Sequence, residues 1–277
     1  MINYISIGNV NAREVEVFTK LNENELKHYF EPEPDGIFIA ETPTVVMRAI
    51  NGGYEPLSLF IEDKYVNTEA ADIISRCNEI SERTGKDISV YTAPLEVISK
   101  ITGYNITRGI LGAFKRKPLR DASEIIKSSS RIAVLEHVEN PTNIGAIFRS
   151  AAALNADAIL LTPGCADTLQ RRAIRAGVGT AFQIEWTCLM DKNYIGLLKN
   201  EGFTTVGMAL RNDTVDINDN RLKNADKLAV FLGNEGNGLR AETIDACDYT
   251  VKIQMSHGVD SLNVAAASAI AFYELFN

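Results

Sequence analysis

Polar residues suited to binding a small molecule gather near the C-terminal end of the chain. A short strand is expected over Tyr249 to Ile253, and Ser261-Leu262-Asn263 opens an apolar helix. The first turn of a helix leaves backbone N–H groups unpaired and carries the positive end of the helix dipole. A turn between that strand and that helix can therefore hold a small molecule or an anion by main chain. The alternative is that Asp260 or Ser261 only caps the helix.

Arg149 is the second candidate for chemistry. It lies in an expected helix that starts in the turn Asn140-Pro-Thr-Asn143 and runs through Leu154. The other residues of that helix are apolar almost all round, so we expect it to be buried. A buried guanidinium is costly unless it is paired, so an acidic residue or a phosphate should meet Arg149. Asn143 also has a structural explanation as the N-cap of the helix.

A glycine-rich loop, Gly233 to Arg240, follows an expected strand over Lys227 to Leu232. It lacks the Gly-Lys-Ser/Thr of a P-loop. The run from Gly236 to Ala241 matches the dinucleotide pattern G-x-G-x-x-A, but the next strand ends without a carboxylate for a ribose diol. In the other interpretation the glycines bring main chain close to a ligand, and Glu235 points into the site towards Arg149.

Strands and helices alternate along both halves of the chain, which predicts an α/β fold. The length of 277 residues suits two domains. The first half is expected to start with a helix over residues 11–30 and to continue as βα units. A polar stretch around Pro118 interrupts the pattern. We therefore predict a first domain over residues 1–117, a linker over 118–130 and a second domain over 131–277.

The net charge of −8 argues against nucleic acid as a partner, but the distribution of basic residues argues for it. Local basic clusters can hold phosphates, because the field that matters at contact acts within about 10 Å. The alternative is that these charges are only solvated. The candidates for RNA binding are Arg108, Lys115, Arg116, Lys117, Arg171, Arg172 and Arg175.

Several classes of protein do not fit the composition. No apolar run approaches the roughly 20 residues that span a bilayer, and the N-terminus lacks the features of a secretory signal. The 4 cysteines are far apart and the 3 histidines do not cluster, so we expect free thiols, no metal and no membrane. The expected location is the cytoplasm.

Three blocks of the second half together resemble the motifs of the SpoU (TrmH-like) RNA 2′-O-ribose methyltransferases, a branch of the SPOUT class. The resemblance covers about the last 150 residues. The first half looks like the L30e-like RNA-binding domain, on Gly36 to Glu41 and Arg108 to Gly112. Two positions depart from the family pattern: Gln254 stands where Pro is frequent, and Ser150 where Thr is frequent. The blocks are Asn140 to Ala151, Leu232 to Leu239 and Ile253 to Ala265.

The resemblance implies a trefoil knot in the second domain, S-adenosylmethionine as methyl donor, and a homodimer with active sites near its interface. It implies 2′-O-methylation of a ribose in structured RNA, with ribosomal RNA ahead of transfer RNA. The alternative is a non-catalytic RNA-binding or ribosome-assembly protein with the same fold. The implied catalytic residues are Asn143, Arg149, Glu235, Ser261 and Asn263. The implied cofactor-binding residues are Leu210, Leu232, Gly233, Ile253, Met255 and Leu262.

Overall fold

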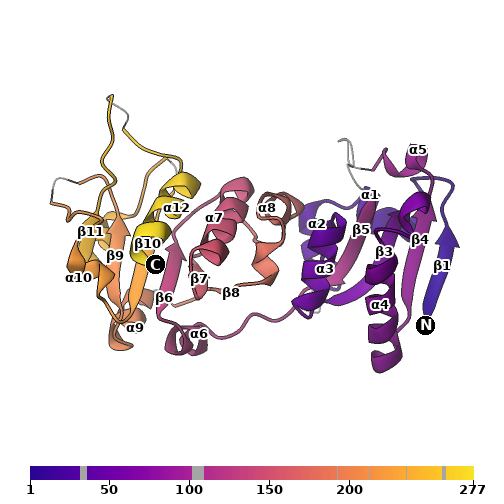
Figure 1. The fold of residues 1–277 in the computed structure, drawn as a ribbon, viewed down its shortest axis with the longest axis horizontal. Helices are drawn as coiled ribbons and strands as arrows, with labels where there is room; N and C mark the ends of the chain where they lie inside the picture. The colour runs from indigo at the N-terminus through magenta and orange to yellow at the C-terminus, as the bar shows by residue number, and fades with distance from the viewer. Residues whose placement is uncertain (32–35, 102–108, 192, 212, 235, 258–259) are drawn as a thin grey trace. The chain divides into compact units, whose positions relative to one another are not determined.

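The computed structural model describes residues 1–31, 36–101, 109–191, 193–211, 213–234, 236–257 and 260–277. It holds one sheet of five strands and one of six, each with its own helices, so the expected α/β fold is confirmed (Figure 1). Contacts divide the chain into two units. Unit 1 comprises Met1–Pro118 and Leu169–Phe182, and unit 2 comprises Leu119–Thr168 and Gln183–Asn277.

The sheet of unit 1 has the order β1-β4-β3-β5-β2. Strands β1, β4 and β3 are parallel, whereas β5 is antiparallel to both β3 and β2. The strands are β1 (Ile2–Ser6), β2 (Ile37–Glu41), β3 (Glu55–Glu62), β4 (Ile88–Ala93) and β5 (Ile110–Lys115). The helices are η1 (Arg13–Val15), α1 (Glu16–Thr19), α2 (Glu23–Lys27), α3 (Pro43–Asn51), η2 (Asp63–Tyr65), α4 (Ala71–Thr84) and α5 (Leu95–Ile98).

Two local expectations for unit 1 were wrong. The single helix over residues 11–30 is broken at Asn22, whose side chain accepts from the backbone N–H of Glu25 while the Glu25 carboxylate accepts from that of Asn22. This reciprocal capping starts a new helix there. Strand β1 was missed because it is an edge strand with four of its five residues exposed, so it lacks the apolar alternation of a half-buried strand.

Residues 169–182 pack into unit 1, although they follow β7 of unit 2 in the chain. The ring of Phe182 lies 5.2 Å from that of Phe38 and 5.1 Å from that of Tyr54. The guanidinium of Arg171 donates to the carbonyl oxygens of Val17 and Phe18, each at 3.1 Å. The prediction of a continuous second domain over 131–277 did not foresee this grouping. The segment carries α8 (Arg171–Ala176) and η3 (Thr180–Phe182).

The sheet of unit 2 is parallel throughout, with the order β11-β9-β10-β6-β7-β8. Its strands are β6 (Arg131–Leu135), β7 (Ala158–Leu161), β8 (Glu185–Cys188), β9 (Thr204–Met208), β10 (Leu228–Leu232) and β11 (Tyr249–Val251). Its helices are α6 (Ala122–Ser128), α7 (Pro141–Ala153), α9 (Tyr194–Asn200), α10 (Asn220–Lys223), α11 (Ala241–Ala246) and α12 (Val264–Leu275).

Helix α6 lies within the predicted linker, which is therefore not an extended connection. Asp121 caps this helix by accepting from the backbone N–H of Ser123, and Ile125 and Ile126 are buried in the core of unit 2. The polar composition around Pro118 marked the start of the segment but not the helix inside it.

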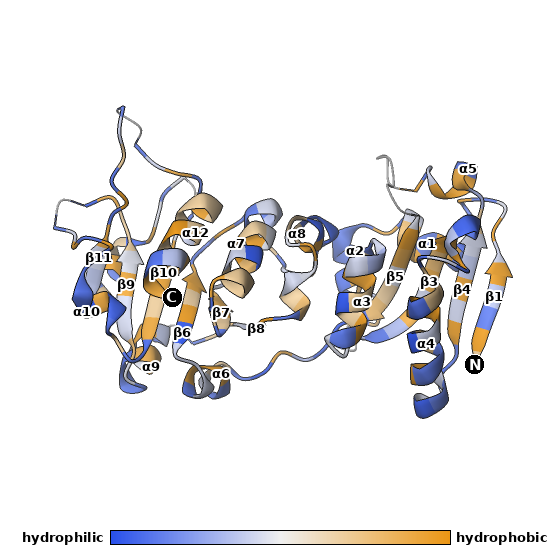
Figure 2. Cartoon of the chain, in the orientation of Figure 1, coloured by the Kyte–Doolittle hydropathy of each residue, from blue (hydrophilic) through white to orange (hydrophobic). Residues whose placement is uncertain are grey.

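The middle strands of unit 2 are buried on both faces, as expected for a parallel sheet covered by helices. In Figure 2, β10 and β6 are mostly white to orange, and α12 is white to orange along much of its length. The sheet and its covering helices build a rigid platform, and connections at the carboxyl ends of the strands are free to form a site. The trefoil knot stays a prediction.

Candidate active site

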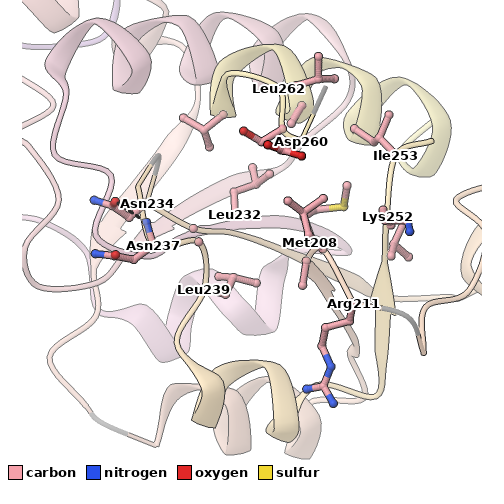
Figure 3. A pocket seen from close by; sticks show the side chains of 18 of the residues that line it. Met208, Arg211, Leu232, Asn234, Asn237, Leu239, Lys252, Ile253, Asp260 and Leu262 are labelled. Carbon is pink, nitrogen blue, oxygen red and sulfur yellow. Dashed lines mark hydrogen bonds between the residues drawn. The ribbon is translucent and has the colours of Figure 1, made fainter. Parts of the chain in front are cut away.

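A cavity of about 390 Å³ lies in unit 2 where β9, β10 and β11 end. Met208, Leu232 and Val251 bring these strand ends to its wall. The rest of the wall comes from the glycine-rich loop after β10 and from the connection into α12 (Figure 3). Its size is that of a small-molecule site, and its place at the carboxyl edge of a parallel sheet is where such folds bind ligands.

The glycine-rich loop is closed on itself and tied to the strand beside it. The backbones of Asn234 and Gly238 exchange two hydrogen bonds, of 3.1 and 2.9 Å. A side chain at Gly233 would place its Cβ 2.2 Å from the backbone carbon of Gly238, so the closed loop requires glycine at position 233. The Asn234 amide donates to the carbonyl oxygen of His137, at 2.9 Å, which joins the loop to the residues after β6.

Glu136, directly after β6, holds the other end of the loop. Its side chain is buried, and its carboxylate accepts from the backbone N–H of Arg240 at 2.7 Å and from Tyr194 Oη at 2.9 Å. It also accepts from Thr243 Oγ1 and from Arg240 Nη2. Burial acts to raise the pKa of Glu136, but these hydrogen bonds outweigh it and leave the pKa below its usual range.

All six predicted cofactor-binding residues line this one cavity, although they come from three separate segments of the chain. Leu232 and Gly233 end β10, Leu210 follows β9, and the other three lie in the connection from β11 to α12. The predicted catalytic residue Ser261 lines it as well. Sequence reasoning missed three charged residues of the wall, Arg211, Lys252 and Asp260, the last having been considered only as a helix cap.

Two of the predicted catalytic residues meet directly. Asn263 Nδ2 donates to Asn143 Oδ1 at 3.1 Å, and Asn143 is only 8% exposed. Asn263 is also the N-cap of α12, because its Oδ1 accepts from the backbone N–H of Ala265. The cap was expected at Asp260 or Ser261, and the cap of α7 was considered at Asn143. The structure places the cap of α7 at Asn140, which leaves the Asn143 side chain inside the helix and facing Asn263.

The expectation of a buried Arg149 was wrong, because its side chain is exposed. Helix α7 buries Ile144, Ile147, Phe148 and Ala151, while Arg149 shares the exposed face with Ala152 and Ala153. The exposed part of the helix consists of small apolar residues, so hydropathy alone could not distinguish it from a core face. Glu235, the expected partner of Arg149, lies outside the described residues.

The predicted RNA-binding residues have different surroundings. Lys115 and Arg116 are half-buried, with Lys115 Nζ 5.6 Å from the Phe30 ring centre and Arg116 Nε donating to the carbonyl oxygen of Ile37. Lys117 is exposed, and its ammonium contacts the Tyr54 ring and the carbonyl oxygen of Gly52.

The second cluster divides in the same way. Arg171 is half-buried and bound to backbone carbonyl groups of unit 1, so the structure gives it a role in packing. Its 4.0 Å ion pair with Glu41 confirms the salt bridge preferred for that acid. Arg172 and Arg175 are exposed, whereas Arg108 lies outside the described residues.

The dinucleotide interpretation of Gly236 to Ala241 does not fit this geometry. A pyrophosphate would have to lie at the N-terminus of the helix that follows the loop. In this protein the Glu136 carboxylate already accepts there from the backbone of Arg240 and from Thr243. A negative charge built into that position repels a phosphate.

Two searches of the described part of the chain bear on the class of protein. Within the described ranges, no group of three or more His, Cys, Asp or Glu side chains is placed to hold a metal ion. Among the helices that the structure describes, none is long and apolar enough to cross a membrane.

The parallel sheet with a cavity at its carboxyl edge, closed by a glycine-rich loop, defines a class that comparison with known proteins names. The model of the SpoU rRNA Methylase family matches residues 130–273, and the chain belongs to this family. An uncharacterized tRNA/rRNA methyltransferase of Mycobacterium tuberculosis is 33% identical over 245 residues, which are 88% of this chain and 82% of the relative. The resemblance seen in the three sequence blocks is thereby confirmed.

Further relatives are similar over smaller parts of the chain or at lower identity. The 23S rRNA (guanosine(2553)-2′-O)-methyltransferase of Bacillus subtilis is 30% identical over 55% of this chain and 60% of its own length. An AdoMet-bound rRNA methyltransferase structure from Sinorhizobium meliloti has a TM-score of 0.81 at 23% identity, covering 98% of this chain and 97% of that one. The SpoU methyltransferase AviRb from Streptomyces viridochromogenes, in complex with AdoMet, has a TM-score of 0.75 at 21% identity, covering 96% and 98%. The two structures have the same fold as this chain.

Proposed function

We propose that this protein transfers a methyl group from S-adenosylmethionine to the 2′-hydroxyl of a ribose in structured RNA. The observation that carries the proposal is the hydrogen bond between Asn263 and Asn143, which joins the connection into α12 to α7 next to the cavity. Membership of the SpoU family supports the reaction class. The relative from B. subtilis, named as a 2′-O-methyltransferase of 23S rRNA, favours ribosomal RNA over transfer RNA.

The cavity suits S-adenosylmethionine in its chemistry. Leu232, Ile253 and Leu262 offer an apolar surface for the adenine, and the tight loop from Gly233 offers main-chain groups. Asp260 places a carboxylate on the wall, which complements a ligand with a sulfonium and an ammonium group (Figure 3). The cofactor supplies the methyl group, and the protein's task is to position the acceptor hydroxyl, which is worth about 7–11 kcal/mol in favourable cases.

The polar residues around the cavity have distinct proposed tasks. Asn143, Ser261 and Asn263 orient the ribose by hydrogen bonds, and Glu235 assists them. Arg149 binds the neighbouring phosphate through its fork of donors, which lowers the proton affinity of the hydroxyl. A guanidinium stays protonated at neutral pH, so we do not assign Arg149 as the base. The requirement for a 2′-hydroxyl selects RNA over DNA.

RNA binding is proposed to extend beyond the cavity. Lys117, Arg172 and Arg175 are exposed cations of unit 1 and suit contacts with phosphates. An L30e-like role for unit 1 in recognising the RNA remains our proposal. The cytoplasm, where such RNA substrates occur, is the proposed location.

A homodimer is proposed through α12 and α7. Exposed apolar residues of α12 recur at helical spacing, and Leu262, Ile270 and Tyr273 are 39%, 38% and 63% exposed. Helix α12 packs beside α7, whose exposed face carries Arg149, so a partner subunit there would bring Arg149 into an interface. Ile270→Asp should give a monomer by light scattering. Leu95→Asp, at a residue of unit 1 that is 50% exposed, is the control and should leave the dimer intact.

The test of the proposed reaction is methyl transfer from labelled S-adenosylmethionine to unmodified total RNA and ribosomal particles, followed by digestion to nucleosides and mass analysis. We expect a 2′-O-methylnucleoside. Label on a base would contradict the roles of Asn143 and Asn263. RNA binding without transfer to any substrate would instead support the non-catalytic RNA-binding protein.

A further inference from the structure

We propose that Glu136 is a positioning residue that holds the cofactor loop in its binding conformation, a role that neither the family match nor the sequence motifs assign. The inference rests on the proposed use of S-adenosylmethionine in the cavity of unit 2. Glu136 does not line that cavity; it acts through Arg240 and the loop that ends there.

Glu136 connects three elements that converge below the loop. It follows β6, and its backbone N–H donates to the carbonyl oxygen of Leu232, the last residue of β10, at 2.9 Å. Its carboxylate accepts from Tyr194 of α9 and from Arg240 and Thr243 at the start of α11. The loop leaves from Leu232 and returns at Arg240, so Glu136 binds both ends of it.

The loop itself needs such an anchor. Its internal closure joins Asn234 to Gly238, and Asn234 is tied to the His137 carbonyl next to Glu136. Leu239, between the closed turn and Arg240, lines the cavity. Moving the start of α11 therefore moves Leu239 and the main chain that faces the ligand.

The carboxylate suits this task because it is buried and fully used. Glu136 is 1% exposed, and its two oxygens accept four hydrogen bonds from side chains and backbone. Arg240 Nη2 also donates to Tyr194 Oη at 2.8 Å, so the partners support one another. Hydrogen bonds to a buried charge are stronger than neutral ones, and a partly satisfied network is costly.

Glu136→Gln tests the role with little change of shape. The glutamine oxygen can still accept from Arg240, but its NH₂ group must face the donors of Thr243, Tyr194 and Arg240. The loop should then shift or loosen. We expect the dissociation constant of S-adenosylmethionine, measured by calorimetry without RNA, to rise about tenfold, the size expected for losing one charge-assisted hydrogen bond. Amide hydrogen exchange should increase over residues 233–239.

Asp248 provides a matched control at the other edge of the same sheet. Its carboxylate accepts from the backbone and hydroxyl of Thr205, at 2.9 and 2.8 Å, near the start of β9. Asp248→Asn should therefore cost stability without changing cofactor affinity. If Glu136→Gln lowers thermal stability as Asp248→Asn does and leaves the dissociation constant unchanged, Glu136 is only structural and the inference fails.

The two proposals fail in different ways. Absence of S-adenosylmethionine binding by the unaltered protein would overturn the proposed function. Binding by the unaltered protein together with unchanged binding by Glu136→Gln would overturn only the inference. Tyr194→Phe removes a single donor to Glu136 and should weaken binding less than Glu136→Gln does; a larger effect would contradict the central place of the carboxylate.

Discussion

The side-chain amide of Asn263 donates to that of Asn143 across 120 positions of the chain, at 3.1 Å. The bond links the cap of α12 to the buried face of α7, so a change in either helix reaches the other. Asn263 therefore serves both the stability of α12 and the geometry of the proposed site.

The two tasks of Asn263 can be separated by substitution. Asn263→Ala removes the cap and should cost about 1 kcal/mol of unfolding free energy. Asn263→Asp keeps an oxygen for the Ala265 N–H but loses the donor to Asn143. We expect both variants to lose methyl transfer by roughly 100-fold, because small misplacements are that costly, and only the alanine variant to lose much stability. Full activity of the aspartate variant would remove the Asn263–Asn143 bond from the site.

Arg149→Ala should separate activity from stability. The side chain is exposed, so its loss should change the unfolding free energy by no more than about 0.5 kcal/mol. Turnover should fall at least about 100-fold if the guanidinium binds the phosphate in the transition state, while calorimetry shows S-adenosylmethionine still bound. Arg83→Ala, another exposed arginine, is the control for loss of charge. Near-normal turnover of Arg149→Ala would exclude Arg149 from the mechanism.

Phe182→Ala should destabilise unit 1, although the residue follows two strands of unit 2 in the chain. Phe182 is 8% exposed and packs on Phe38 and Tyr54, so its removal should cost about 3–5 kcal/mol. Hydrogen exchange should increase in β2 and α3. Trp186→Ala is the comparison, because Trp186 lies four residues on but packs on Phe148 in unit 2. Faster exchange in unit 2 alone after Phe182→Ala would contradict the assignment of residues 169–182.

The contribution of Glu136 to stability should depend on pH. Its pKa is lower in the folded protein than in the unfolded chain, so its stabilisation is complete above the unfolded value of about 4.3. It is lost as the pH falls through the folded pKa. Urea unfolding of the unaltered protein and Glu136→Gln should therefore differ most near neutral pH and converge in acid. A constant difference down to the lowest pH would show that ionised Glu136 is not the stabilising form.

RNA binding should depend on Arg172 and Arg175 more than on Arg171. Replacing both exposed residues by alanine should weaken binding and reduce the slope of log K against log salt by about 1.4, or 0.7 for each phosphate contact to single-stranded RNA. Arg171→Ala should mainly lower thermal stability, because its guanidinium binds the carbonyl groups of Val17 and Phe18. An unchanged slope in the double variant would mean that these two cations are only solvated.

Expectations from local sequence succeeded where short-range physics dominates. Buried strands such as β7 and β10 are short runs of apolar residues ended by polar or glycine residues, and Gly85, at positive φ, ends α4 as predicted. The segments around the cavity could also be named in advance, because strand ends and glycine turns mark them. Glu136 was missed, although an acidic residue at the end of a buried strand and next to a polar motif was the available signal.

The wrong expectations concern surroundings that arise from distant parts of the chain. Arg149 was expected to be buried because its helix is apolar, but which face of α7 meets the core depends on the sheet and α12. Local composition thus identified the alternating α/β elements, the glycine loop and the residues suited to a site. The pairing of Asn263 with Asn143, the anchoring of Arg240 by Glu136 and the packing of residues 169–182 into unit 1 came from tertiary contacts. Such contacts join residues many positions apart, and hydrophobic periodicity carries information only about neighbours within a few turns or strand residues.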